Sequence, residues 1–81
     1  MFTSNTILRI VIDPKVMAGK PVIKGTRLTV QHMLSLLAQG ITVQQITAEY
    51  PGITQEDITA CLLFAAQTLE NTSFVPGPVG A

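Results

Sequence analysis

Apolar side chains at the start of the chain recur with a period of two. In the segment TILRIVID, residues 6–13, one face of an extended chain carries Leu8, Ile10 and Ile12. This period and the β-branched composition predict a β-strand, which a turn at Asp13-Pro14 would end. After a loop rich in Gly and Pro, the segment TRLTV predicts a second short strand over residues 26–30.

From residue 30 onward the apolar period becomes helical. Four apolar side chains fall on one face of a helix: Val30, Met33, Leu34 and Leu37. Gly40 is typical of the residue that follows a helix C-terminus. Thr42 and Gln45 form a capping-box pattern that predicts the start of a second helix, which Pro51-Gly52 would end.

The third predicted helix, residues 54–70, is the most apolar of the three. Thr54 and Asp57 predict its start, and the expected inward stripe is Ile58, Leu62, Ala65 and Leu69. Residues 60–66 are apolar on every side, which is typical of a fully buried helix. Two short strands and two short helices cannot surround such a helix, so we expect it to pack against its own copy in a homodimer. The expected interface residues are Ile58, Leu62, Leu63, Phe64 and Ala66.

These elements predict one mainly α domain over residues 1–70. The expected architecture is a three-helix DNA/RNA-binding-like bundle with a short N-terminal β-strand pair. Residues 71–81, NTSFVPGPVGA, are rich in Pro and Gly and predict a flexible C-terminal tail. Phe74 and Val75 are the candidate residues of this tail for docking on a partner.

Composition and charge favour partners. Of the 81 residues, 47% are hydrophobic and 12% are charged, which is more apolar surface than so small a domain buries easily. An identical partner is the simplest way to cover it. All five Lys and Arg lie within residues 1–27 beside a single acid, whereas residues 28–81 contain four acids and no Lys or Arg. This asymmetry predicts either a basic face for an anion such as nucleic acid or mutual neutralisation of the two halves.

The sequence contains few signals of a catalytic site, a metal site or a membrane-spanning segment. The only histidine, His32, falls in the polar sector of its predicted helix, and the only cysteine, Cys61, lies in an apolar run, where it behaves as a small hydrophobe. We therefore expect no enzymatic activity, no metal and no cofactor. The longest apolar run, residues 60–66, is far shorter than the ~18 residues that a membrane span needs. With no signal-peptide pattern, we expect a cytoplasmic protein without membrane contact.

Residues 42–62 resemble a helix-turn-helix with its turn at Pro51-Gly52. A helix-turn-helix places the start of its second helix in the major groove of DNA. The residues that would face bases there are Thr54, Gln55 and Thr59. Glu56 and Asp57 oppose a close approach to phosphates, so a three-helix core without DNA contact is the alternative.

The stretch GKPVIKGTR, residues 19–27, is the most basic part of the chain. Gly19 and Gly25 permit a positive φ and Pro21 stiffens the chain, which predicts a rigid loop. The cations expected to clamp phosphates from this region are Lys15, Lys20, Lys24 and Arg27. For Arg27, an ion pair with an acid such as Glu49 or Asp57 is an equal alternative. The glycine spacing does not match a phosphate-binding P-loop.

The order DPKVMAGKPVIKGTRLTV, a helix, YPGITQEDI and a final helix resembles the bacterial domain-of-unknown-function family 433, whose members are regarded as VapB-like antitoxins. The likeness covers about residues 9–70. Its signature here is Gly19-Lys20-Pro21, Gly25-Thr26-Arg27, Tyr50-Pro51 and Thr54 with Asp57-Ile58. The resemblance implies a dimeric DNA-binding-like bundle that pairs with a PIN-like ribonuclease toxin and represses its own promoter.

One feature departs from that pattern. VapB-like antitoxins often block the toxin with a basic C-terminal tail, but residues 71–81 contain no Lys or Arg. Docking of Phe74 and Val75 would then replace it. Two hypotheses follow: an antitoxin of a type II toxin-antitoxin pair that binds DNA as an autorepressor, or a protein-interaction subunit that binds a toxin or another partner without binding nucleic acid.

Overall fold

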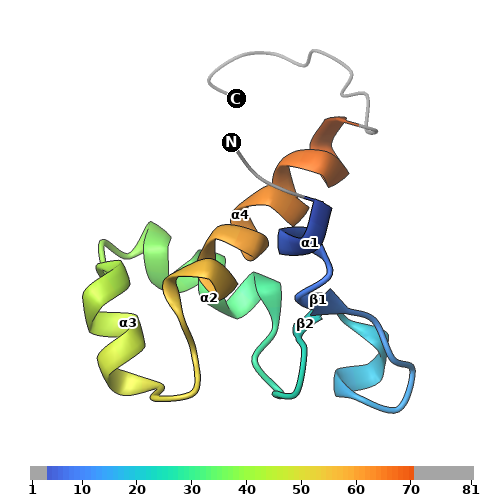
Figure 1. The fold of residues 1–81 in the computed structure, drawn as a ribbon, viewed down its shortest axis with the longest axis horizontal. Coiled ribbons are helices and arrows are strands. Elements are labelled where there is room, and N and C mark those ends of the chain that lie inside the picture. The colour runs from blue at the N-terminus through green and yellow to red at the C-terminus, as the bar shows by residue number, and fades with distance from the viewer. Residues whose placement is uncertain (1–3, 71–81) are drawn as a thin grey trace, which may run out of the picture.

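The computed structural model describes residues 4–70, which form a mainly helical domain with one small sheet (Figure 1). The elements, in chain order, are α1 (Ser4–Ile7), β1 (Ile10–Val11), the 3-10 turn η1 (Met17–Gly19), β2 (Val22–Ile23), α2 (Val30–Ala38), α3 (Val43–Glu49) and α4 (Gln55–Glu70). The two strands pair antiparallel, with Ile10 opposite Ile23 and Val11 opposite Val22. Three longer helices and a short antiparallel strand pair confirm the predicted mainly α class with a small N-terminal sheet.

The first predicted strand is much shorter than expected. Residues 4–7 form the helical turn α1, and only Ile10 and Val11 pair as a strand. The partner strand limits this pairing, because Pro21 has no N–H to donate and a tight turn begins at Ile23. Leu8 and Ile12, which were predicted to share a strand face with Ile10, lie outside the strand and are exposed.

The second predicted strand, residues 26–30, is wrong. The strand that pairs with β1 is Val22–Ile23, which the sequence pattern placed inside the loop. Residue 29 forms only an isolated bridge to Val22. Thr29 instead caps α2, because its side chain accepts a hydrogen bond from the backbone N–H of His32 at 3.0 Å.

The predicted boundaries of the first two long helices are confirmed. Gly40 follows the C-cap of α2 with a φ of 88°, the left-handed conformation that favours glycine. At the start of α3, the Thr42 side chain accepts from the backbone N–H of Gln45, and the Gln45 side chain accepts from that of Thr42, which completes the capping box.

The predicted start of α4 is also confirmed. The backbone N–H of Thr54 donates to Asp57 Oδ2 at 2.9 Å, and the backbone N–H of Asp57 donates to Thr54 Oγ1 at 3.3 Å. Just before this cap, Pro51-Gly52 forms a turn closed by a 2.8 Å bond from Ile53 N–H to the Tyr50 carbonyl. The turn brings the buried side chain of Ile53 into the core.

The core lies where α4 crosses the other elements. In Figure 1, α4 runs through the middle of the molecule and α3 lies at its edge. Helix α4 contacts α1, β1, α2 and α3. The buried cluster consists of Ile23, Val30, Met33, Ile46, Ile53, Ile58 and Cys61.

The inward stripe of α4 differs from the prediction. Ile58 is buried as expected, but Leu62 and Leu69 are 49% and 56% exposed, and Cys61 takes the inward position instead. The buried residues of α4 are Asp57, Ile58, Ala60 and Cys61, so the packed face is turned away from the predicted stripe. Within residues 4–70, the outer face of α4 therefore has no covering element.

Candidate nucleic-acid interface

The basic loop is held in place by its two central apolar residues. Val22 and Ile23 are 1% and 2% exposed, although they stand in the middle of GKPVIKGTR. Lys20, Lys24 and Arg27 lie on either side of this anchor and are exposed. Val22 and Ile23 thus anchor the loop in the core while its cations face solvent.

A tight turn separates Lys24 from Arg27. Gly25 has a φ of 81°, and the backbone N–H of Thr26 donates to the Ile23 carbonyl at 3.0 Å. Sequence reasoning missed the hydroxyl of Thr26, which donates to the same carbonyl at 2.8 Å and accepts from the Leu28 N–H at 3.0 Å. A Thr directly after a turn glycine was the available signal, because short polar side chains bond nearby backbone groups.

A second turn, η1, precedes Lys20. Gly19 has a φ of 81°, as its residue type predicted, but Met17 and Ala18 also have positive φ values of 49° and 56°. This conformation costs a non-glycine residue roughly 1–2 kcal/mol, and no sequence signal indicated it. Bonds from Gly19 N–H to the Val16 carbonyl and from Lys20 N–H to the Met17 carbonyl, both 3.1 Å, close the turn.

Arg9 binds two acids at the start of α4. Its Nη1 donates to Asp57 Oδ1 and its Nη2 to Glu56 Oε2, both at 3.1 Å. The bond to Asp57 and the nearby negative charges raise the pKa of Arg9, against a smaller effect of desolvation. Sequence reasoning missed this cluster, because its members are 47 and 48 positions apart.

The alternative ion pair of Arg27 with Glu49 or Asp57 does not form. Asp57 is occupied by Arg9, and Arg27 lies exposed on the loop. Lys15 is exposed as well, and the backbone N–H of Lys15 donates to Asp13 Oδ1 at 2.9 Å. Within residues 4–70 the side chains of Lys15, Lys20, Lys24 and Arg27 form no ion pair. Mutual neutralisation of the two halves therefore involves only Arg9.

The three residues predicted to face bases have different environments. The hydroxyl of Thr54 is engaged, since it donates to Asp57 Oδ2 at 3.1 Å as part of the cap. Thr59 is half-buried, whereas Gln55 is exposed. Arg9 connects this helix start to the basic loop. Its carbonyl accepts a hydrogen bond from the Lys24 N–H at 2.7 Å, and its side chain donates to Asp57.

The predicted interface residues of α4 separate into two groups. Ile58 is 1% exposed in the core of its own chain, so its assignment to a surface between copies is wrong. Leu62 and Ala66 are exposed, while Leu63 and Phe64 are half-buried. Phe74 and Val75, the predicted docking residues of the tail, lie outside the described residues.

The only cysteine and the only histidine of the sequence have no features of a catalytic site among the described residues. Cys61 is buried, and burial together with the charge of Asp57 raises its pKa to about 11, which leaves its thiol protonated and poorly reactive near neutral pH. His32 is exposed, with Nε2 3.4 Å from the hydroxyl of Tyr50. Residues 4–70 contain no group of three His, Cys, Asp or Glu placed to hold a metal ion, and none of their helices is long and apolar enough to cross a membrane.

Comparisons with known proteins identify the family. No curated protein matches the chain. The crystal structure of a DUF433 member protein from Anabaena variabilis is similar, with 34% sequence identity and a TM-score of 0.72. The alignment covers 76% of this chain and 61% of that one. The family model described as "Protein of unknown function (DUF433)" matches residues 10–65, which is more than half of the sequence, and the chain therefore belongs to the DUF433 family.

Proposed function

We propose that this protein is the DNA-binding antitoxin of a type II toxin-antitoxin pair and represses its own promoter as a homodimer. The observation that carries the proposal is that most of its Lys and Arg side chains are exposed and form no ion pair among the described residues. Of five Lys and Arg, only Arg9 is in an ion pair within residues 4–70. The other four are exposed, and three of them flank the buried pair Val22 and Ile23. Exposed cations of this kind can neutralise phosphates.

Roles follow from these positions. Lys15, Lys20, Lys24 and Arg27 hold phosphates. At the start of α4, Gln55 is the residue best placed to read a base edge, because its side chain is exposed. Thr54 has a smaller role in this proposal, because its hydroxyl already bonds Asp57 in the helix cap. Thr59 also has a smaller role, because its side chain is half-buried.

Arg9 removes an objection to this arrangement. Glu56 and Asp57 at the start of α4 would repel a phosphate backbone, as the sequence indicated. Both carboxylates receive a hydrogen bond from the Arg9 guanidinium, so one of their two negative charges is offset locally. This supports a helix-turn-helix role for α3 and α4 despite the acidic helix start.

The partner proposed from the family resemblance is a PIN-like ribonuclease toxin. Because the tail contains no Lys or Arg, its contact with such a toxin would be apolar and would involve Phe74 and Val75.

Binding of the purified protein to DNA from just upstream of its own gene tests the proposal. Fluorescence anisotropy at low and near-physiological salt, with random duplex as competitor, is the measurement. We expect binding that survives the competitor and weakens steeply as salt rises. Absence of binding at both salt concentrations would contradict a repressor.

A second candidate function has its own support. The exposed apolar side chains Leu8, Ile12, Leu62 and Leu69 favour a protein-interaction subunit without nucleic-acid binding. The same anisotropy experiment discriminates the two, because a subunit of this kind would bind neither its upstream DNA nor the competitor.

The proposed dimer predicts the effect of a charge on the outer face of α4. Leu62→Glu is expected to raise the dimer dissociation constant by about 100-fold or more, because a carboxylate buried in an apolar interface lacks a partner. Since Leu62 is 49% exposed in the single chain, the fold should tolerate the change. Sedimentation velocity measures the result, with the exposed Gln44→Glu on α3 as a charge-matched control. Equal dimerisation of both variants would place the interface elsewhere.

A further inference from the structure

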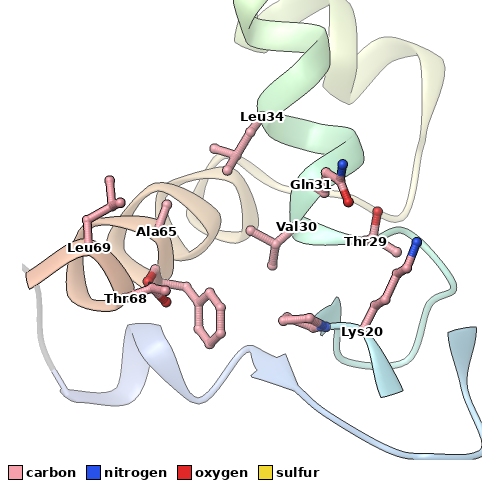
Figure 2. A pocket seen from close by; sticks show the side chains of 10 residues that line it. Lys20, Thr29, Val30, Gln31, Leu34, Ala65, Thr68 and Leu69 are labelled. Atoms are coloured by element: carbon pink, nitrogen blue, oxygen red, sulfur yellow. The ribbon is translucent and has the colours of Figure 1, made fainter. Parts of the chain in front are cut away.

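An apolar groove lies between the C-terminal half of α4 and the start of α2 (Figure 2). It has a volume of about 410 Å³. The apolar residues that line it are Pro21, Val30, Leu34, Phe64, Ala65 and Leu69. Figure 2 shows Leu34 and Val30 of α2 facing Ala65 of α4 across this space.

Of the four polar residues that line the groove, Thr29 is buried and its side chain accepts the His32 N–H, while the other three are exposed. Lys20 and Gln31 are exposed, as is Thr68 on α4. The apolar interior is uncovered within residues 4–70, although covering it would remove apolar surface from water. A good occupant is therefore an uncharged segment with one or two large apolar side chains.

We propose that residues 71–81 of the same chain occupy this groove, with Phe74 as the anchor. The segment NTSFVPGPVGA has no charged side chain and places Phe74, Val75 and Pro76 next to one another. It also begins beside the groove, because Leu69, one of the lining residues, is separated from Asn71 only by Glu70.

The tether is long enough. Four residue steps from Glu70 to Phe74 span at most about 13–14 Å. Ala65 lies only about 6 Å back along the helix axis from Leu69, at ~1.5 Å per residue. Pro76 cannot continue a helix and disfavours the helical conformation of Val75, so α4 cannot extend as one helix through the whole tail.

Tethering favours this occupant over a second copy of the chain. A short linker gives the tail an effective concentration of roughly millimolar order at its own groove, which exceeds the free protein concentration in most experiments. The volume of the groove suits a few side chains better than the whole face of a second helix, whose diameter is about 10 Å. Occupation of the groove does not depend on DNA binding, and a toxin that contacts Phe74 would have to displace it from the groove.

A single tryptophan reports on the proposed contact. The chain has no Trp, so Phe74→Trp introduces one fluorophore at the anchor, and Val79→Trp provides a matched control in the same tail. We expect the Phe74→Trp variant to emit at shorter wavelength than the Val79→Trp variant. Its acrylamide quenching constant should be about threefold lower, because an aromatic ring in an apolar groove is shielded from water.

Two further measurements identify the site and the chain that supplies the tail. Adding Ala65→Arg to the Phe74→Trp variant fills the groove and should remove the protection of the indole. Adding Leu69→Asp instead, at an exposed position of the border, should weaken the protection without disturbing the helix, as circular dichroism verifies. The protection should not change on dilution. Equal quenching of the two tryptophan variants, protection that both groove substitutions leave intact, or protection lost on dilution would each overturn the proposal.

Discussion

Replacing Lys20, Lys24 and Arg27 together by Gln is expected to weaken binding to the upstream DNA by about 100-fold at near-physiological salt, taking about 1 kcal/mol per lost phosphate contact. The slope of the logarithm of affinity against the logarithm of salt should become shallower by roughly three, one for each cation removed. Both effects follow because each neutralised phosphate releases condensed counterions.

This variant should fold like the original protein. All three side chains are exposed, and none forms an ion pair within residues 4–70. Anisotropy titrations at several salt concentrations measure the effect. Lys20→Arg with Lys24→Arg, which keeps both charges, is the matched control and should retain the slope. A triple variant with the original slope would show that the loop does not contact phosphates.

Replacing Asp57 by Ala is expected to cause the largest loss of stability among the charged positions. The loss of its capping bonds with Thr54 costs about 1–2 kcal/mol. The change also leaves Arg9 without its Asp57 partner, 48 positions away in sequence. Because the Asp57 side chain is only 9% exposed, water replaces these bonds poorly.

Glu56→Ala is the matched comparison for this prediction. Glu56 binds the same guanidinium, but its side chain is 70% exposed, and exposed ion pairs contribute little. Urea unfolding followed by circular dichroism should give a clearly lower midpoint for Asp57→Ala than for Glu56→Ala. Similar midpoints would mean that the contacts of Asp57 do not hold α4 to β1. The double variant with Arg9→Gln measures how strongly Arg9 and Asp57 are coupled.

Helix boundaries were predictable because their signals are local. Thr42 with Gln45 and Thr54 with Asp57 bond within three positions, and Gly40 needs only its own positive φ. The exposed cations of the loop were predictable for a similar reason, because long charged side chains rarely leave solvent unless they are paired. Membership of the DUF433 family was also indicated by short local motifs and their order: Gly19-Lys20-Pro21, Gly25-Thr26-Arg27, Tyr50-Pro51 and Thr54 with Asp57-Ile58.

The strand pairing and the buried face of α4 depend on contacts between residues far apart in the sequence. The partner of β1 turned out to be Val22–Ile23 rather than residues 26–30, because strand pairing depends on which backbone groups the whole fold brings together. The face of α4 that is buried was likewise decided by α1, α2 and β1 packing against one side of a helix that is apolar all round.

The role of Arg9 could not be read from its sequence neighbours. In sequence it was one more cation in the basic half of the chain, on an expected strand. In the fold it is the one cation within residues 4–70 that forms an ion pair, and it connects the turn before β1 to the start of α4. The sequence by itself determined the three longer helices, their caps and the basic loop, since those depend on residues a few positions apart. Only the tertiary structure decided which charges are neutralised and which apolar surface stays open, because both depend on segments far apart in the chain, such as Arg9 and Asp57 at 48 positions.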